Sequence, residues 1–126
     1  LGEDGQVEFK AVNACIQFLP TLDGRALITV EDLRQADGAL HPVQQAMVEC
    51  HGSQCGFCTP GFVMSLWALY QQKSKDAGTG RAPAREAICD ALTGNLCRCG
   101  TYARIVAAVE SVAGGVGHYQ PGQEGA

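Results

Sequence analysis

The spacing of the cysteines limits most strongly what this chain can fold into. Of the seven cysteines, Cys55 and Cys58 form a C-x2-C pair, and Cys97 and Cys99 form a C-x-C pair. Two close pairs, separated by residues 59–96, are typical of a metal site with four thiolate ligands. The other cysteines, at positions 15, 50 and 89, stand alone. The spacing therefore predicts a four-cysteine metal centre.

Composition excludes several classes of protein. A length of 126 residues allows about one domain. The first residues lack the pattern of a signal peptide, so we expect reduced thiols and a cytoplasmic location rather than a secreted disulfide framework. A net charge of −4 without a basic run argues against nucleic acid as a partner. No apolar stretch reaches the roughly 18 residues of a membrane span.

Two helices are predicted around the first cysteine pair. Pro42 suits a first turn, and apolar residues recur at i, i+3, i+4 and i+7 up to Cys50, so this helix should end near Gly52. Cys50 lies on the apolar stripe, which favours a packed thiol over a ligand. Thr59 as N-cap and Pro60 at N1 begin a second helix that is apolar on nearly every side.

Two more helices surround the second pair. One starts near Pro83, ends at Gly94 and carries Cys89 beside its apolar face as a second packed thiol, and Thr101 can cap the other. Both cysteine pairs thus lie at a corner between consecutive helices. This order predicts a mainly α protein, a four-helix bundle with approximate twofold symmetry.

The residues before position 40 have β character. Val7 and Phe9 alternate with charged residues, and residues 26–30 form a short apolar run after a turn. Two isolated strands are marginal in water. We therefore expect remnant strands of a sheet whose remainder lies upstream of Leu1.

Four thiolates suit either tetrahedral zinc or an iron–sulfur cluster. Helix N-termini after both pairs favour an anionic group such as a [2Fe-2S] cluster with its thiolates. Gly56, Gly61 and Gly100 would let backbone amides approach the sulfurs, and Arg98 lies between two candidate ligands. The cluster is thus favoured, and a structural zinc module remains the alternative.

Two longer motifs resemble a known family. They are His51-Gly-Ser-Gln-Cys-Gly-Phe-Cys-Thr-Pro-Gly61 and Gly94-Asn-Leu-Cys-Arg-Cys99, the second followed by Tyr102. Together they closely resemble the helical [2Fe-2S] domain of the xanthine dehydrogenase and aldehyde oxidase family of molybdenum hydroxylases. The stretch Leu40-His-Pro-Val-Gln44 looks most like the xanthine dehydrogenase branch, whereas Cys99-Gly-Thr-Tyr departs from the Cys-Thr-Gly-Tyr order of many xanthine dehydrogenases.

The resemblance implies roles for particular residues. Cys55, Cys58, Cys97 and Cys99 would hold the cluster nearest the molybdenum cofactor. Gln54 would hydrogen-bond the molybdopterin, and Cys99 would also relay the electron. No catalytic residue is expected within this chain alone.

The resemblance also gives Cys15 a role and divides the chain. Cys15 would be the last ligand of a second, plant-type [2Fe-2S] cluster whose other cysteines come earlier. Residues 1–38 would then be the end of a β-grasp, ferredoxin-like domain with its connection. Residues 39–113 would form the helical [2Fe-2S] domain, and residues 114–126 a linker or disordered tail.

The expected function is electron transfer in an oxidoreductase. The chain would pass electrons from a molybdopterin-binding subunit or domain to a second [2Fe-2S] cluster and to an FAD-binding subunit or domain. The resemblance implies a parent enzyme that hydroxylates xanthine or hypoxanthine in purine catabolism. Alternatives are the iron–sulfur subunit of an aldehyde or N-heterocycle oxidoreductase, and the zinc module.

Overall fold

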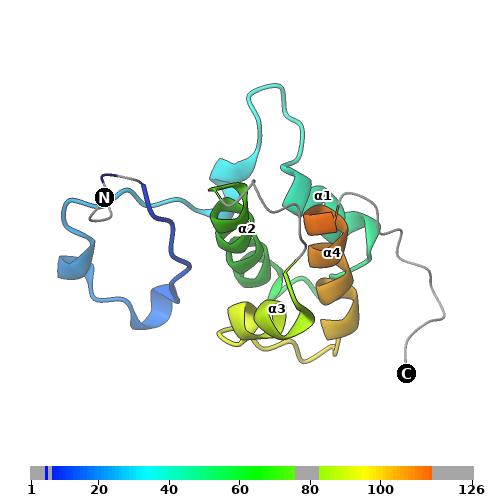
Figure 1. The fold of residues 1–126 in the computed structure, drawn as a ribbon. Helices are drawn as coiled ribbons and strands as arrows, with labels where there is room; N and C mark the ends of the chain where they lie inside the picture. Colours follow the sequence, from blue (N-terminus) through cyan, green and yellow to red (C-terminus); the bar gives the residue numbers. More distant parts are fainter. Residues whose placement is uncertain (1–4, 6, 76–82, 115–126) are drawn as a thin grey trace.

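Four α-helices form the body of the molecule (Figure 1). The computed structural model describes residue 5 and residues 7–75 and 83–114. The helices are α1 (Pro42–Glu49), α2 (Thr59–Lys75), α3 (Arg85–Leu92) and α4 (Tyr102–Gly114). Helix α1 packs against α2 and α4, and α3 also contacts both α2 and α4. The predicted mainly α, four-helix architecture is confirmed.

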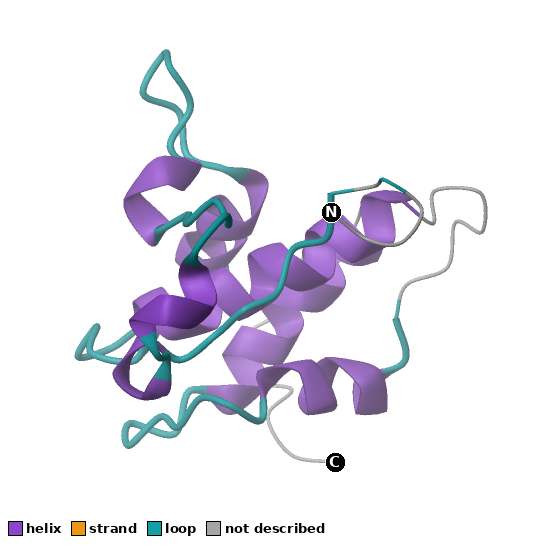
Figure 2. Cartoon of the chain, turned by 90° about the vertical axis from the view of Figure 1, so that its left-hand side faces the viewer, coloured by secondary structure: helices purple, strands orange, loops and turns teal. Residues whose placement is uncertain are grey.

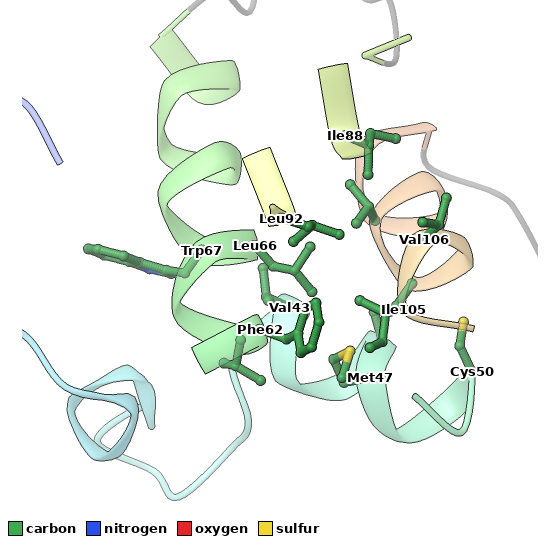
Figure 3. Packing of buried hydrophobic residues seen from close by; sticks show 14 of the residues in the cluster. Val43, Met47, Cys50, Phe62, Leu66, Trp67, Ile88, Leu92, Ile105 and Val106 are labelled. Carbon is green, nitrogen blue, oxygen red and sulfur yellow. The ribbon is translucent and has the colours of Figure 1, made fainter. Parts of the chain in front are cut away.

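The core lies between the helices because each contributes an apolar face (Figure 3). Phe62 of α2, Ile88 of α3 and Ile105 of α4 are fully buried. Val43 and Met47 of α1, spaced by one turn, close the core from the fourth side. Cys50, at the end of the same stripe, is 2% exposed, so it is a packed thiol as predicted.

Helix α1 begins at a capping box that also ties it to the preceding segment. The Nδ1 atom of His41 accepts a hydrogen bond from the Val43 N–H at 3.2 Å, and Oε1 of Gln44 accepts from the His41 N–H at 3.0 Å. The Gln44 amide also donates to the Val30 carbonyl at 3.2 Å. Burial lowers the pKa of His41, which keeps the imidazole neutral and able to accept.

The predicted strands at residues 7–10 and 26–30 are not formed, and the described residues contain no strand at all (Figure 2). Their place is taken by irregular chain and by three 3-10 helices, η1 (Ala14–Ile16), η2 (Leu19–Leu22) and η3 (Val30–Leu33). A strand needs a neighbour to pair with its N–H and C=O groups, and the helical body offers none. Phe9 instead packs its ring edge-on against Trp67, 4.8 Å between centroids.

The structure also places Cys89 and the end of the second helix. Cys89 lies on α3 but is exposed rather than packed, because it sits beside the buried face that Ile88 and Leu92 share. Helix α2 extends to Lys75. Residues 76–82 and nearly all of the predicted tail lie outside the described residues. Among the described helices, none combines the length and the apolar character that crossing a membrane requires.

Candidate metal centre

The first cysteine loop, residues 51–58, leads from α1 to α2. His51 adopts a left-handed φ of 51°, and the Gly52 N–H donates to the Met47 carbonyl at 2.9 Å, so the chain reverses directly after α1. A Cβ on Gly52 would lie 2.8 Å from the Met47 sulfur, so a larger residue there would force the buried Met47 side chain to move. Across the loop, the Ser53 and Thr59 hydroxyls are 2.7 Å apart.

The second cysteine loop, residues 93–101, leads from α3 to α4 and is fixed to α2. The Asn95 amide donates to the Ser65 hydroxyl at 2.8 Å. A Cβ on Gly61 would collide with Oδ1 of the Asn95 side-chain amide, so Gly61 makes room for this side chain rather than for a sulfur. Gly56 and Gly100, one in each loop, have φ values of 82° and 75°, which favour glycine.

The two loops bring the four predicted thiols together in cross-loop pairs. The Cys55 and Cys99 side chains are hydrogen-bonding neighbours, and so are Cys58 and Cys97. Cys97 is buried and Cys58 partly buried, whereas Cys55 and Cys99 are exposed. Over the described part of the chain, no three or more Cys, His, Asp or Glu side chains are grouped to hold one metal ion.

Hydrogen bonds and burial give the sulfurs of Cys97 and Cys58 different pKa values. The Thr101 hydroxyl, 3.1 Å from the Cys97 sulfur, and the Thr101 N–H lower the pKa of Cys97 to about 6. Burial, with the neighbouring Cys97, raises the pKa of Cys58 to about 11. At neutral pH, Cys97 is therefore a thiolate that accepts a hydrogen bond from the protonated Cys58 thiol. A metal cation between the two sulfurs would take the place of that proton.

In the exposed pair, Cys55 and Cys99, the pKa of one thiol is likewise lowered and that of the other raised. The N–H of Phe57, followed by the Cys99 thiol, lowers the pKa of Cys55. The Cys55 N–H lowers the pKa of Cys99, but the Cys55 side chain, burial and the nearby charges outweigh it, so the pKa of Cys99 rises. Each pair thus combines one thiolate-like and one thiol-like sulfur, with backbone N–H donors directed at the sulfurs.

This donor set fits a two-metal cluster better than a single ion. Tetrahedral zinc requires four sulfurs at about 2.3 Å from one centre. A [2Fe-2S] cluster instead takes two protein ligands on each of its two irons. Two cross-loop pairs, with N–H donors that can stabilise negative charge on sulfur, match the second arrangement.

Comparison with known proteins decides the family. Residues 29–110 match the family described as "[2Fe-2S] binding domain". The chain belongs to this family. The resemblance to the [2Fe-2S] domain of the xanthine dehydrogenase and aldehyde oxidase family is thereby confirmed.

Curated relatives of this [2Fe-2S] domain are oxidoreductases. Xanthine dehydrogenase of Blastobotrys adeninivorans is 44% identical over 109 residues, which make up 86% of this chain and 7% of the relative. Aldehyde oxidase 1 of Rattus norvegicus is 43% identical over 100 residues, 79% of this chain and 7% of the relative. The chain therefore spans a small part of these proteins. Nicotine 6-hydroxylase small subunit of Paenarthrobacter nicotinovorans is 44% identical over 108 residues, 86% of this chain and 60% of the relative.

A solved structure shares the fold. Quinoline 2-oxidoreductase from Pseudomonas putida 86 superimposes with a TM-score of 0.67 at 30% identity, over 81% of this chain and 59% of that one. The aligned 81% of the chain is more than the helical part from Pro42 to Gly114 could supply, so the superposition also includes residues outside that part.

The remaining predicted site residues lie at different places. Gln54 is exposed in the first cysteine loop, directly before Cys55. Cys15 is exposed on η1, a separate element from both cysteine loops. Cys15 as a cluster ligand and Gln54 as a pterin contact stay predictions.

Sequence reasoning missed the residues that support the second loop. Thr101 was expected to cap α4, but its hydroxyl also contacts the Cys97 sulfur. Tyr102 accepts a hydrogen bond from the Cys97 N–H at 2.7 Å and packs edge-on against Phe62. Their positions directly after the C-x-C pair and Gly100 were the available signal.

Proposed function

We propose that this chain is an electron-transfer module that holds one [2Fe-2S] cluster. Cys55 and Cys99 would ligate one iron, and Cys58 and Cys97 the other. The observation that carries the proposal is the meeting of four thiols in two cross-loop pairs beside backbone N–H donors. The match to the [2Fe-2S] binding domain supports it.

The bound cluster would supply a site that accepts and releases single electrons. The chain's own residues supply everything else. Cys97, with its lowered pKa, offers a thiolate at neutral pH, and the Phe57 and Thr101 N–H groups donate to ligand sulfurs. Cys97 belongs to the buried core that also contains Phe62 and Ile105, and this core shields its sulfur from water.

Metal analysis of the purified chain tests the proposal. After anaerobic purification from iron-supplied cells, we expect about two irons and two sulfides per chain. One-electron reduction should produce a paramagnetic signal from one site. Because a structural module would instead hold a single zinc ion, a colourless protein with one zinc and no sulfide would refute the cluster.

The wider assembly is part of the same proposal. Electrons would arrive from a molybdopterin-binding partner, with Gln54 as a hydrogen-bonding contact to the pterin and Cys99 as ligand and electron relay. They would leave through a second [2Fe-2S] cluster, to which Cys15 contributes a ligand, and reach an FAD-binding partner. The exposure of Gln54, Cys99 and Cys15 supports such contacts.

Two classes of parent enzyme are candidates, and they differ in the substrate that they hydroxylate. Relatives named xanthine dehydrogenase support hydroxylation of xanthine or hypoxanthine. The 44% identity to a nicotine 6-hydroxylase small subunit supports instead a separate subunit that serves an N-heterocycle hydroxylase. Affinity purification of the native complex, followed by assays with hypoxanthine, nicotine and quinoline, distinguishes them by the substrate that reduces the cluster.

We propose the following division of the chain. Residues 1–38 would be the end of a ferredoxin-like domain, residues 39–113 the helical [2Fe-2S] domain, and residues 114–126 a tail.

Approximate twofold symmetry within the helical domain belongs to the same proposal. Exchanging α1 with α3 and α2 with α4 carries the α1–α4 contact onto α2–α3, the α1–α2 contact onto α3–α4, and the α2–α4 contact onto itself, which supports the symmetry. The symmetry would place one cysteine pair after the first helix of each hairpin.

A further inference from the structure

Thr101 is a buried polar residue beside a candidate ligand. It is 3% exposed, and its Oγ1 lies 3.1 Å from the Sγ of Cys97, which is itself 7% exposed. The Thr101 carbonyl accepts hydrogen bonds from the Arg104 and Ile105 N–H groups, at 3.1 and 3.0 Å. The start of α4 therefore fixes the backbone from which this hydroxyl reaches the sulfur.

The direction of this hydrogen bond follows from chemistry. A cysteine sulfur bound to a metal is a thiolate, which accepts but cannot donate. The hydroxyl must then be the donor whenever Cys97 is a ligand. Because both groups are buried, water cannot readily replace the hydroxyl if it is removed.

We propose that Thr101 is a positioning residue that raises the reduction potential of the cluster through its hydrogen bond to the Cys97 sulfur. This inference rests on the proposed function. Reduction adds one negative charge to the cluster and its sulfurs, and a hydrogen bond to a sulfur stabilises the more negative state. Loss of the hydroxyl should therefore favour the oxidised cluster.

The first cysteine loop provides a matched comparison. Thr59 directly follows Cys58, at the start of α2, and its hydroxyl lies 2.7 Å from the Ser53 hydroxyl. The partner of this threonine is thus an oxygen, whereas the partner of Thr101 is a sulfur. Thr59→Val removes the same chemical group near the other cysteine pair and should leave the potential unchanged.

The test is a potentiometric titration of the full chain with its cluster, followed by electron paramagnetic resonance. Thr101→Val keeps the shape and removes the hydroxyl, Thr101→Ala removes it with less bulk, and Thr101→Ser retains it. At the wild-type midpoint, we expect the reduced-to-oxidised ratio of the valine and alanine variants to fall about tenfold, the weight of one hydrogen bond to a charged group. A tenfold change corresponds to about 59 mV for one electron. Thr101→Ser should stay near the wild type.

The order of the variants separates hydrogen bonding from packing. If Thr101 acts through its shape alone, serine should disturb the site more than valine, and the inference is overturned. A wild-type potential in whichever hydroxyl-free variant holds the cluster overturns it as well. If the wild-type chain itself takes up no iron and sulfide, the proposed function fails and this inference with it, so the two failures are distinguishable.

Discussion

The helical part of the molecule, residues 42–114, and the N-terminal segment, residues 7–33, use apolar residues in opposite ways. Within residues 7–33, all of which the structure describes, Leu33 is the sole buried residue, while Ile16, Phe18 and Leu19 are at least three-quarters exposed. The helical part instead buries apolar residues from every helix. Figure 1 shows the segment extending to one side of α2, away from α1 and α4.

The difference shows where the stability of the candidate centre originates. Both cysteine loops are anchored in the helical part, by contacts such as Gly52 N–H to Met47 O and Asn95 to Ser65. The N-terminal segment touches that part at a few places, including Phe9 on Trp67 and Gln44 on the Val30 carbonyl. The helical part should therefore hold its cluster largely independently of the segment.

Cysteine substitutions should give the largest difference between the regions. Cys97→Ser and Cys55→Ser each remove a ligand from one cross-loop pair, so we expect loss of the cluster colour and of most bound iron. Cys15→Ala in the N-terminal segment, and Cys50→Ala and Cys89→Ala in the helices, should keep the visible spectrum. Iron and sulfide analysis of all five variants provides the measurement, and retained spectra in the first two would contradict the ligand assignment.

Deleting one phenylalanine ring in each region should give the next largest effect. Phe62 is 1% exposed and Phe18 is 77% exposed. Phe62→Ala should lower the free energy of unfolding by about 3–5 kcal/mol because it opens a cavity in the core. Phe18→Ala should change it by less than about 0.5 kcal/mol. Anaerobic urea unfolding followed by circular dichroism measures both, and equal losses would show that the segment is as firmly packed as the core.

The same contrast explains how much of the fold could be predicted from sequence. Apolar periodicity over two or more turns identified all four helices, because a helix satisfies its own backbone and needs only one buried face. The strands were predicted from runs of about five residues. A strand depends on a neighbour that the local sequence does not specify, so Val30, expected in a strand, begins η3 instead.

Prediction of the candidate site followed the same division. Residue type and spacing alone identified the four candidate ligands, because two close cysteine pairs are typical of a metal site. Their pairing across the loops was not predictable, because it depends on how α1–α2 and α3–α4 pack. Nor was the role of Gly61, whose missing side chain accommodates Asn95 from a loop about thirty residues away.

Acid should weaken the junction between the two regions through His41. Burial lowers its pKa below 6.5, so the unfolded chain binds a proton more readily than the folded one. The contribution of neutral His41 is fully present above pH 6.5 and is lost as the pH falls through the lowered folded pKa. Protonation also removes the acceptor for the Val43 N–H. Unfolding free energies from pH 7.5 to 5, compared with His41→Asn, isolate this effect, since asparagine caps without titrating. Parallel profiles for the two proteins would contradict it.

The smallest effect should come from the contact between Asn13 and the second cysteine loop. The Asn13 amide donates to the Gly94 carbonyl at 3.4 Å, a long and exposed hydrogen bond that joins the segment to the turn before Cys97. Exposed polar groups are solvated when their partner is lost, so Asn13→Ala should cost less than about 0.5 kcal/mol and leave the cluster spectrum unchanged. Hydrogen exchange offers a finer readout: protection of the Asn95 N–H, bonded within the helical part to the Leu92 carbonyl at 3.0 Å, should be the same in both proteins. Faster exchange there in Asn13→Ala would mean that the segment holds the loop in place, and the independence of the helical part would then have to be given up.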